Sequence, residues 1–397
     1  MQPLKGITIV ALEHAIAAPF ATRQLADLGA RVIKIERPGV GDFARGYDER
    51  VKGLASHFVW TNRSKESLTL DVKHEEAQKI LMRLINEEAD VVVQNLAPGA
   101  AARLGLSYEA LSKIKPGIIV CDISGYGDDP INPGPYRDKK AYDLLIQSEA
   151  GFVSVTGTPD EPSKSGNSIA DIAAGMYAYT NILAALMHKQ QTGQGQRIDV
   201  SMLESLSEWM GYPLYYAYDG ATPPPRSGAS HATIYPYGPF PAGDGKTVML
   251  GLQNEREWKV FCDKVLANPA LATDERFASN AKRSAARVDL SALIIAAFST
   301  HTAEQVAALL EQAGIANAQV RTMAEVWEHP QLQARERWRE VDTSSGPIPA
   351  LLPPGSWQHG APRMDAVPAL GQHTDAILTH FGYSAERIAA LHAQGVV

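Results

Sequence analysis

Residues 4–36 read LKGITIVALEHAIAAPFATRQLADLGARVIKIE, and this stretch carries the pattern that decides the fold. The apolar run Ile7–Leu12 is typical of a buried strand, Pro19–Leu28 is typical of a helix, and Arg31–Glu36 is a second apolar strand. Short apolar strands that alternate with helices indicate parallel βαβ units. We therefore expect the chain to begin as an open α/β sheet.

The alternation continues through the first half of the chain. Further strands are expected at Ser67–Leu70, Ala89–Gln94, Gly117–Ile123 and Arg197–Val200. Further helices are expected at Glu75–Glu87, Tyr108–Ile114, Ile172–His188 and Met202–Met210. The stretch Gly220–Gly238, rich in Pro, Gly and Ser, marks a change of domain, and the strand and helices after Thr247 predict a smaller α+β unit.

Composition narrows the class of protein. The 397 residues are 45% hydrophobic and 20% charged, as in ordinary globular proteins, and the net charge of −7 gives no basic footprint for nucleic acid. The N-terminus lacks the apolar core of a signal peptide, and the small-residue stretch Ile169–Met187 predicts close helix packing, so no membrane partner is expected. Two cysteines without metal-type spacing favour a cytoplasmic location.

Asp171 is the candidate for chemistry because it opens the long helix Ile172–His188. A carboxylate in the first turn of a helix faces unpaired backbone N–H groups and the positive end of the helix dipole. These would hold it ionised and oriented, as a carboxylate nucleophile requires. The alternative is that Asp171 is only a helix cap, because aspartate is among the best capping residues, and Asp143 competes for both roles.

Residues at the strand ends indicate where an anionic ligand would bind. Arg37 and the loop Asn95–Gly99 follow expected strands, and ligands of open α/β sheets bind at the carboxyl ends of strands. Basic residues that could complete a phosphate-binding rim, or could be solvated surface, are Lys73, Arg103, Lys139 and Lys140. The turn Gly39–Gly41 lacks the third glycine of a dinucleotide fingerprint. Neither a Gly-x-Ser-x-Gly elbow nor a His-x-x-His pattern occurs, so we expect no serine nucleophile and no metal site.

Many ordered pieces of the chain resemble the family III CoA transferases of the CaiB–BaiF type, which include formyl-CoA transferase and carnitine CoA transferases. The resemblance runs over essentially the whole chain. The pieces that carry it are Leu4–Val10 (LKGITIV), Leu28–Gly39 (LGARVIKIERPG), Asn62–Lys65 (NRSK), Leu70–Lys73 (LDVK), Asn95–Gly99 (NLAPG), Arg103–Gly105 (RLG), Ile123–Gly127 (ISGYG), Ser168–Gly175 (SIADIAAG), Thr192–Met202 (TGQGQRIDVSM) and Leu370–Thr374 (LGQHT).

The resemblance implies a fold, an assembly and a set of site residues. Residues 1–220 and a returning segment, 331–397, would form a Rossmann-like large domain, with a small α+β domain at 221–330 between them. Two such chains would interlock as a ring-like homodimer. The nucleophilic aspartate falls on Asp171, and Tyr142 falls beside the acyl group. Positions that contact coenzyme A fall on His14, Ala17, Arg37, Leu70, Lys73, Asn95, Leu96, Arg103, Lys140 and Met202.

Two departures separate CoA transfer from racemisation. The α-methylacyl-CoA racemases of this family carry a histidine at the position of Tyr142 and a glutamate near Asn254. They need both groups because a proton is removed from one face of the substrate and returned on the other. A phenol and an amide are poor proton carriers near neutral pH. We therefore favour CoA transfer, with a racemase-like enzyme as the alternative.

Further departures bear on the substrate. The formyl and oxalyl enzymes carry a run of glycines near Gly251 and a glutamine at Ile16, and neither feature is present, which argues against oxalate. The segment that begins at Arg226 is similar to transferases that act on itaconate, mesaconate and citramalate. Arg226, Ser230 and His231 could hold a distal carboxylate through charge-assisted bonds, or the segment could be a connector with chance polar residues.

The expected reaction moves CoA from succinyl-CoA to a small dicarboxylate such as itaconate or mesaconate. Asp171 would form an anhydride and then an aspartyl-CoA thioester, with oxyanions stabilised by backbone N–H groups near Asp171 or Gly251. We expect no permanently bound cofactor, because the coenzyme A thioester is a co-substrate that carries its own energy. A formyl-type or carnitine-type CoA transferase is a further alternative.

Overall fold

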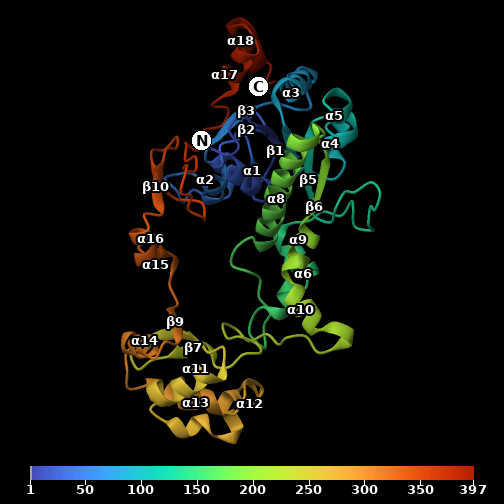
Figure 1. The fold of residues 1–397 in the computed structure, drawn as a ribbon. Coiled ribbons are helices and arrows are strands. Elements are labelled where there is room, and N and C mark those ends of the chain that lie inside the picture. The colour runs from blue at the N-terminus through green and yellow to red at the C-terminus, as the bar shows by residue number, and fades with distance from the viewer. Residues whose placement is uncertain (1) are drawn as a thin grey trace. The chain divides into compact units, whose positions relative to one another are not determined.

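In a computed structural model that describes residues 2–397, the chain forms two compact units (Figure 1). The first unit contains the residues up to Gly151, together with Ser165–Gly211 and Gln331–Val397. The second contains Phe152–Lys164 and Tyr212–Pro330. The chain passes from one unit to the other through segments that include α10 (Gly211–Tyr216) and α16 (Pro330–Ala334).

The core of the first unit is a six-stranded parallel sheet with the order β3-β2-β1-β4-β5-β6. Its strands are β1 (Thr8–Leu12), β2 (Arg31–Glu36), β3 (Lys65–Thr69), β4 (Val91–Gln94), β5 (Ile119–Ser124) and β6 (Arg197–Ser201). In the centre of the sheet, Val10 pairs with Ile33 of β2 and with Val92 of β4. The expected open α/β sheet is confirmed, and its strand order reverses between β1 and β4.

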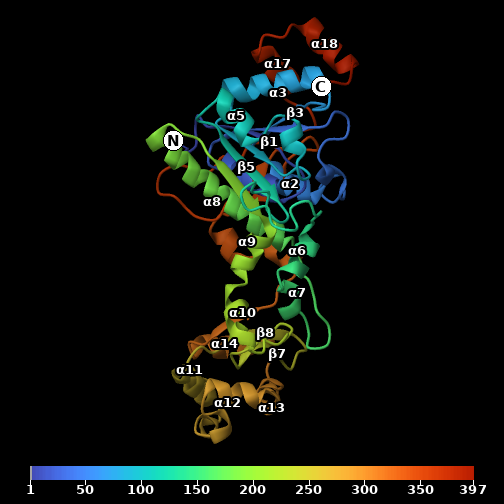
Figure 2. The same ribbon diagram turned by 90° about the vertical axis from the view of Figure 1, so that its right-hand side faces the viewer.

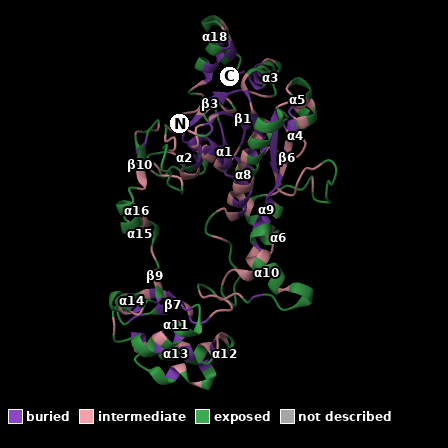
Figure 3. Ribbon diagram, in the orientation of Figure 1, coloured by how far each residue is buried: buried purple, intermediate pink, exposed green. Residues whose placement is uncertain are grey.

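Helices cover both faces of this sheet, and Figure 2 shows α3 and α8 on opposite sides. The elements of this unit are α1 (Ala17–Asp27), η1 (Phe43–Gly46), α2 (Ser56–Asn62), α3 (Glu75–Glu88), α4 (Ala100–Arg103), α5 (Tyr108–Ile114), α6 (Asp143–Glu149), α8 (Ile169–Thr192), α9 (Met202–Trp209), the hairpin β10 (Trp338–Val341) and β11 (Ile348–Leu351), α17 (Thr374–His380) and α18 (Ala385–Ala393). The bounds of β2 and α5 are those that the sequence predicts. Most residues of the sheet are buried (Figure 3), and the central strands β1 and β4 carry apolar side chains on both faces.

The C-terminal segment returns to the first unit and covers β3, which lies at the edge of the sheet. The Ser67 N–H donates to His373 Nδ1 over 3.1 Å, and the Thr69 N–H donates to Thr374 Oγ1 over 3.0 Å. These side chains satisfy backbone groups that an edge strand would otherwise expose. Apolar residues of α17 and α18, including Leu378 and Leu391, complete the core between the sheet and α3.

The long helix α8 packs tightly against α1. A side chain at Gly175 would place its Cβ 2.7 Å from the Ala17 carbonyl oxygen and 2.9 Å from the Phe20 ring, so only glycine allows this approach. By length and composition α8 is apolar enough to cross a membrane, and α13 with α14 passes the same test as a bent pair. The buried residues of α8, such as Ala174 and Ala178, pack within the first unit, as the small-residue pattern predicts.

The second unit is an α+β arrangement around a three-stranded antiparallel sheet in the order β7-β8-β9. Its elements are α7 (Phe152–Val155), η2 (Tyr218–Gly220), β7 (Tyr237–Pro241), β8 (Thr247–Gly251), α11 (Glu255–Val260), η3 (Phe261–Val265), η4 (Pro269–Ala272), η5 (Glu275–Phe277), α12 (Asn280–Ala285), α13 (Arg287–Phe298), α14 (Ala303–Gln312), β9 (Ala316–Gln319) and α15 (Met323–Trp327). Aromatic side chains dominate its core, with Trp258, Phe261, Phe277 and Phe298 all fully buried.

Residues 152–164 and 212–220 belong to the second unit, although the sequence analysis places them with the first. For the former segment the reason is hydrogen bonding. The Gly228 N–H donates to the Gly157 carbonyl over 2.7 Å, and Arg226 donates to the carbonyls of Thr158 and Pro159. Contacts between residues so far apart leave no mark in local sequence patterns.

Candidate active site

The loops after β1 and β4 meet where the strand order of the sheet reverses. The His14 N–H donates to Asn95 Oδ1 over 2.9 Å, and Asn95 Nδ2 donates back to the His14 carbonyl over 2.9 Å. In open α/β sheets, ligands bind at this reversal, outside the carboxyl ends of the strands. The reciprocal His14–Asn95 pair therefore fixes two loops at the expected place for a ligand.

The structure brings most of the predicted coenzyme A contacts to this edge of the sheet. Those that directly follow or closely follow strand ends are His14, Arg37, Leu70, Asn95, Leu96 and Met202. Ala17 opens α1, while Lys73 and Lys140 are exposed in loops and Arg103 ends α4. Arg103 Nη1 lies 3.0 Å from where a Cβ of Gly99 would be, so its guanidinium folds back over the Asn95–Gly99 loop. That these residues contact coenzyme A remains a prediction.

Phe43 joins two of these residues, and the sequence analysis did not single it out. The centroid of the Phe43 ring lies 4.9 Å from that of His14. The guanidinium carbon of Arg37 lies 4.6 Å from the Phe43 centroid and makes a cation–π contact with this ring. Arg37 also donates through Nε and Nη2 to the Gly41 carbonyl. The Gly39–Gly41 turn thus orients an arginine.

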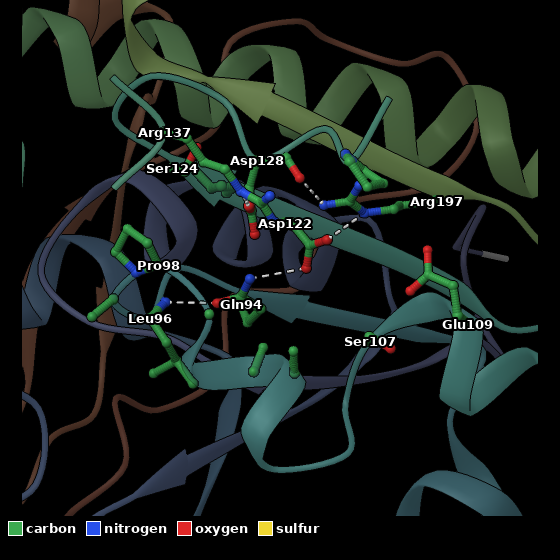
Figure 4. A pocket seen from close by; sticks show the side chains of 16 residues that line it. Gln94, Leu96, Pro98, Ser107, Glu109, Asp122, Ser124, Asp128, Arg137 and Arg197 are labelled. Carbon is green, nitrogen blue, oxygen red and sulfur yellow. Dashed lines mark hydrogen bonds and ion pairs between the residues drawn. The ribbon is translucent and has the colours of Figure 1, made fainter. Parts of the chain in front are cut away.

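A cavity of about 120 Å³ lies at the ends of β4 and β5 (Figure 4). Asp122 accepts from Gln94 Nε2 over 2.9 Å and from Arg197 Nε over 2.8 Å. Gln94 Oε1 in turn accepts from the Leu96 N–H over 2.7 Å. The chain of bonds Arg197–Asp122–Gln94–Leu96 holds the loop that begins at Asn95, so this cavity borders the same loop as the reversal point.

Asp171 lies in the first turn of α8, but it does not cap that helix. The N-cap is Ser168, whose side chain makes no capping hydrogen bond. Asp143 at the start of α6 caps it instead, because Asp143 Oδ1 accepts from the N–H groups of Ala170, over 2.8 Å, and of Asp171, over 3.3 Å. Gln147 Nε2 donates to the other oxygen of Asp143 over 2.6 Å and fixes its orientation.

The expectation that the helix terminus holds Asp171 ionised is wrong. Burial, with a smaller contribution from the negative charge of Asp143, raises the pKa of Asp171 from 3.8 to about 7. Asp143 takes the N–H groups that would have stabilised the Asp171 carboxylate. A carboxylate that titrates near neutrality and is poorly solvated is a stronger nucleophile than an exposed one, so this arrangement favours chemistry over capping.

Two phenols share the surroundings of Asp171. Tyr142 forms the N-cap of α6 and is 72% exposed. Tyr47 follows η1, and its pKa is raised by burial, then by the negative charges of Asp42 and Asp171 and by Tyr142. Tyr47 therefore lies close enough to Asp171 and Tyr142 to sense their charges. The sequence analysis missed Tyr47, because no local pattern links it to residues so distant in the chain.

The three residues proposed for substrate carboxylate binding lie in the second unit. Arg226 donates to the carbonyls of Thr158 and Pro159, each over 2.9 Å, which agrees with the connector alternative for this residue. Ser230 uses its carbonyl to accept from Ser227 Oγ. His231 Nδ1 accepts from the N–H groups of Thr233 and Ile234, so the neutral ring carries its proton on Nε2. Stacking on Tyr237, with centroids 5.3 Å apart, fixes that ring.

Asn254 and the Gly251 region also belong to the second unit. Asn254 is the N-cap of α11, since its Oδ1 accepts from the Glu257 N–H over 3.0 Å and its Nδ2 donates to Glu257 Oε1. It thus has a structural role.

Among residues 2–397, no group of three or more His, Cys, Asp or Glu side chains could hold a metal ion.

A family model described as CoA-transferase family III matches residues 4–374. The chain belongs to this family. As a family III CoA-transferase it is an enzyme that uses CoA thioesters as co-substrates.

Curated relatives and solved structures agree with the assignment. The chain is 33% identical to a succinate–glutarate CoA-transferase of Agrobacterium fabrum, over 95% of each chain. It is 32% identical to a succinyl-CoA:mesaconate CoA-transferase of Haloarcula hispanica, over 86% of each. A CAIB/BAIF family protein from Brucella suis has a similar structure, with a TM-score of 0.83, 33% identity, and coverage of 95% of this family III transferase and 99% of that chain.

Proposed function

We propose that this family III CoA-transferase moves CoA from succinyl-CoA to a small dicarboxylate such as itaconate or mesaconate, with Asp171 as the covalent nucleophile. The observation that carries the proposal is the Asp171 carboxylate in the first turn of α8, whose pKa is raised to about 7 by burial and by Asp143. The relatives named for glutarate and mesaconate support a C5 dicarboxylate as the acceptor.

The reaction would proceed in four acyl transfers. An Asp171 oxygen attacks the thioester carbonyl of succinyl-CoA, the C–S bond breaks, and an aspartyl–succinyl anhydride and CoA thiolate result. The thiolate attacks the aspartyl carbonyl, releases succinate and leaves aspartyl-CoA. The acceptor carboxylate then attacks aspartyl-CoA to form a second anhydride and free the thiolate. Attack of the thiolate on the acceptor's carbonyl gives the product thioester and regenerates Asp171.

Other residues have supporting roles in this proposal. The rim formed by His14, Arg37 and Asn95 would bind the CoA thioester. Nε2 of His231, with the hydroxyl of Ser230 and any free N–H of Arg226, would bind the distal carboxylate of the acid. Two copies would interlock as a homodimer, which light scattering of the purified protein tests directly.

The test uses Asp171→Asn, with Asp138→Asn as a control for loss of one carboxylate on an exposed loop of the same unit. Succinyl-CoA is incubated with itaconate, mesaconate, citramalate, glutarate, oxalate, formate and carnitine separately, and products are identified by mass. We expect Asp171→Asn to lose at least a thousandfold in transfer rate, as nucleophile variants do. Full activity of that variant would refute Asp171 as the nucleophile. Turnover only with oxalate, formate or carnitine would refute an acceptor of the itaconate or mesaconate type. Solvent deuterium at the α-carbon of a 2-methylacyl-CoA without any acid would indicate a racemase instead.

A further inference from the structure

Around β2 lies a cluster of charged side chains that the proposed chemistry does not use. Lys34 is in β2, Lys65 opens β3, and Glu13 and Asp42 lie in the loops after β1 and β2. Lys34 Nζ lies 2.6 Å from Asp42 Oδ2 and 3.3 Å from Glu13 Oε1, and Lys65 Nζ lies 2.6 Å from the same Glu13 oxygen. All four side chains are completely buried. Buried ion pairs carry a large desolvation cost and are a poor source of stability, so their presence calls for another reason.

Asp42 connects this cluster to two loops. Its Oδ1 accepts from the N–H groups of Ala15, in the loop after β1, and of Ala44, in η1, both over 2.9 Å. Its other oxygen is occupied by Lys34. Ala15 has a φ of 60°, a left-handed conformation that a residue with a Cβ adopts only when its surroundings hold it there. Asp42 is part of what holds it.

The two loops that Asp42 joins carry the rim. His14 immediately precedes Ala15, and its own N–H and carbonyl are fixed by Asn95. Phe43 follows Asp42 and lies between the His14 ring and the Arg37 guanidinium. A shift of the Asp42 carboxylate would therefore move His14 and Arg37 together.

We propose that Lys34 and Asp42 form a positioning pair for the CoA thioester. The Lys34 ammonium fixes the Asp42 carboxylate, and this carboxylate holds the loop after β1 and the helix η1 in place. His14 and Arg37 are thereby positioned for the ligand before it binds. The cost of burying the pair is offset by a preorganised rim, which loses less entropy on binding. This inference rests on the proposed place of CoA at the rim.

The test compares Asp42→Asn with Asp27→Asn. Both replacements keep the side-chain shape and remove the charge of a buried carboxylate in the first unit. Asp27 lies at the other end of α1, where it accepts from Arg23 and Arg63, so it controls for the loss of a buried ion pair. Coenzyme A itself is the probe, and its Kd is measured by calorimetry well below the Tm of the least stable variant.

We expect Asp42→Asn to weaken CoA binding about tenfold, which corresponds to about 1.4 kcal/mol, and Asp27→Asn to leave it within about threefold. Hydrogen exchange of the amides of Ala15 and Ala44 should accelerate in the first variant only. If Asp42→Asn does not fold, the Lys34→Met/Asp42→Asn double variant removes a balanced pair and should show the same loss of affinity. Equal Kd values for wild type and the Asp42 variant, or equal losses in both single variants, would overturn the inference alone. Failure of the wild type to bind CoA would overturn the proposed site as well.

Discussion

Replacing Asp171 with asparagine is expected to stabilise the protein at alkaline pH and to change its stability little at acidic pH. Burial, and to a lesser extent Asp143, raises the pKa of Asp171 from 3.8 to about 7. Between these two pH values the folded chain binds more protons than the unfolded chain, so the free energy of unfolding falls as the pH rises through this window. Because asparagine does not titrate, this fall in the free energy of unfolding is absent in the variant.

The size of the effect follows from the pKa shift. One pKa unit corresponds to about 1.4 kcal/mol, so a rise of roughly three units sets an upper limit of about 4 kcal/mol above neutral pH. Asp171 retains some contact with solvent, which screens its charge, so about 2 kcal/mol is the expected value. With about 2 °C of Tm per kcal/mol in a unit of this size, Asp171→Asn should raise the Tm by about 4 °C at alkaline pH.

The assay is thermal unfolding of the ligand-free protein at about pH 4.5 and about pH 8.5. The first pH is near the pKa of Asp171 in the unfolded chain, and the second is above its pKa in the folded chain. Asp138→Asn, which replaces an exposed carboxylate, should shift the Tm by the same small amount at both pH values. A gain in Tm for Asp171→Asn that is equal at the two pH values would refute the reasoning, because an effect of shape or packing would not depend on pH. The same variant should be more stable and inactive, as expected when a functional group whose burial costs stability is removed.

Three further predictions concern other parts of the molecule. Asp143→Asn removes a negative charge that raises the pKa of Asp171, so the acidic limb of the pH–rate profile should move to lower pH; an unchanged limb would contradict this coupling. Gly175→Ala would place a Cβ 2.7 Å from a backbone oxygen of α1 and should cost about 1–3 kcal/mol in urea unfolding, whereas Gly166→Ala, whose Cβ meets nothing within 4 Å, should cost much less. Arg226→Ala should release the segment 152–164 to limited proteolysis without changing CoA affinity, and an unchanged cleavage pattern would show that the guanidinium does not hold that segment.

The sequence predicts those residues of the site that local patterns place at the ends of strands. The rim residues His14, Arg37 and Asn95 could be placed at one edge because each follows a strand of a parallel sheet, and such ends meet. Phe43 and Tyr47 could not, because their importance comes from ring contacts and charges of residues far along the chain. The hydrogen bonds of Arg226 could not be predicted for the same reason, since its carbonyl partners lie about 70 positions away.

The sequence by itself determined the open α/β sheet, the bounds of strands such as β2, and the family. These follow from apolar periodicity and from ordered local motifs, which act over a few residues. The tertiary structure alone decided the state of Asp171. Its helix position suggested an ionised carboxylate that caps the helix. Instead Asp143, from another helix, accepts from the backbone N–H groups and adds a second negative charge beside the buried Asp171. A pKa depends on burial and on whatever lies within a few ångströms, and only the folded chain sets both.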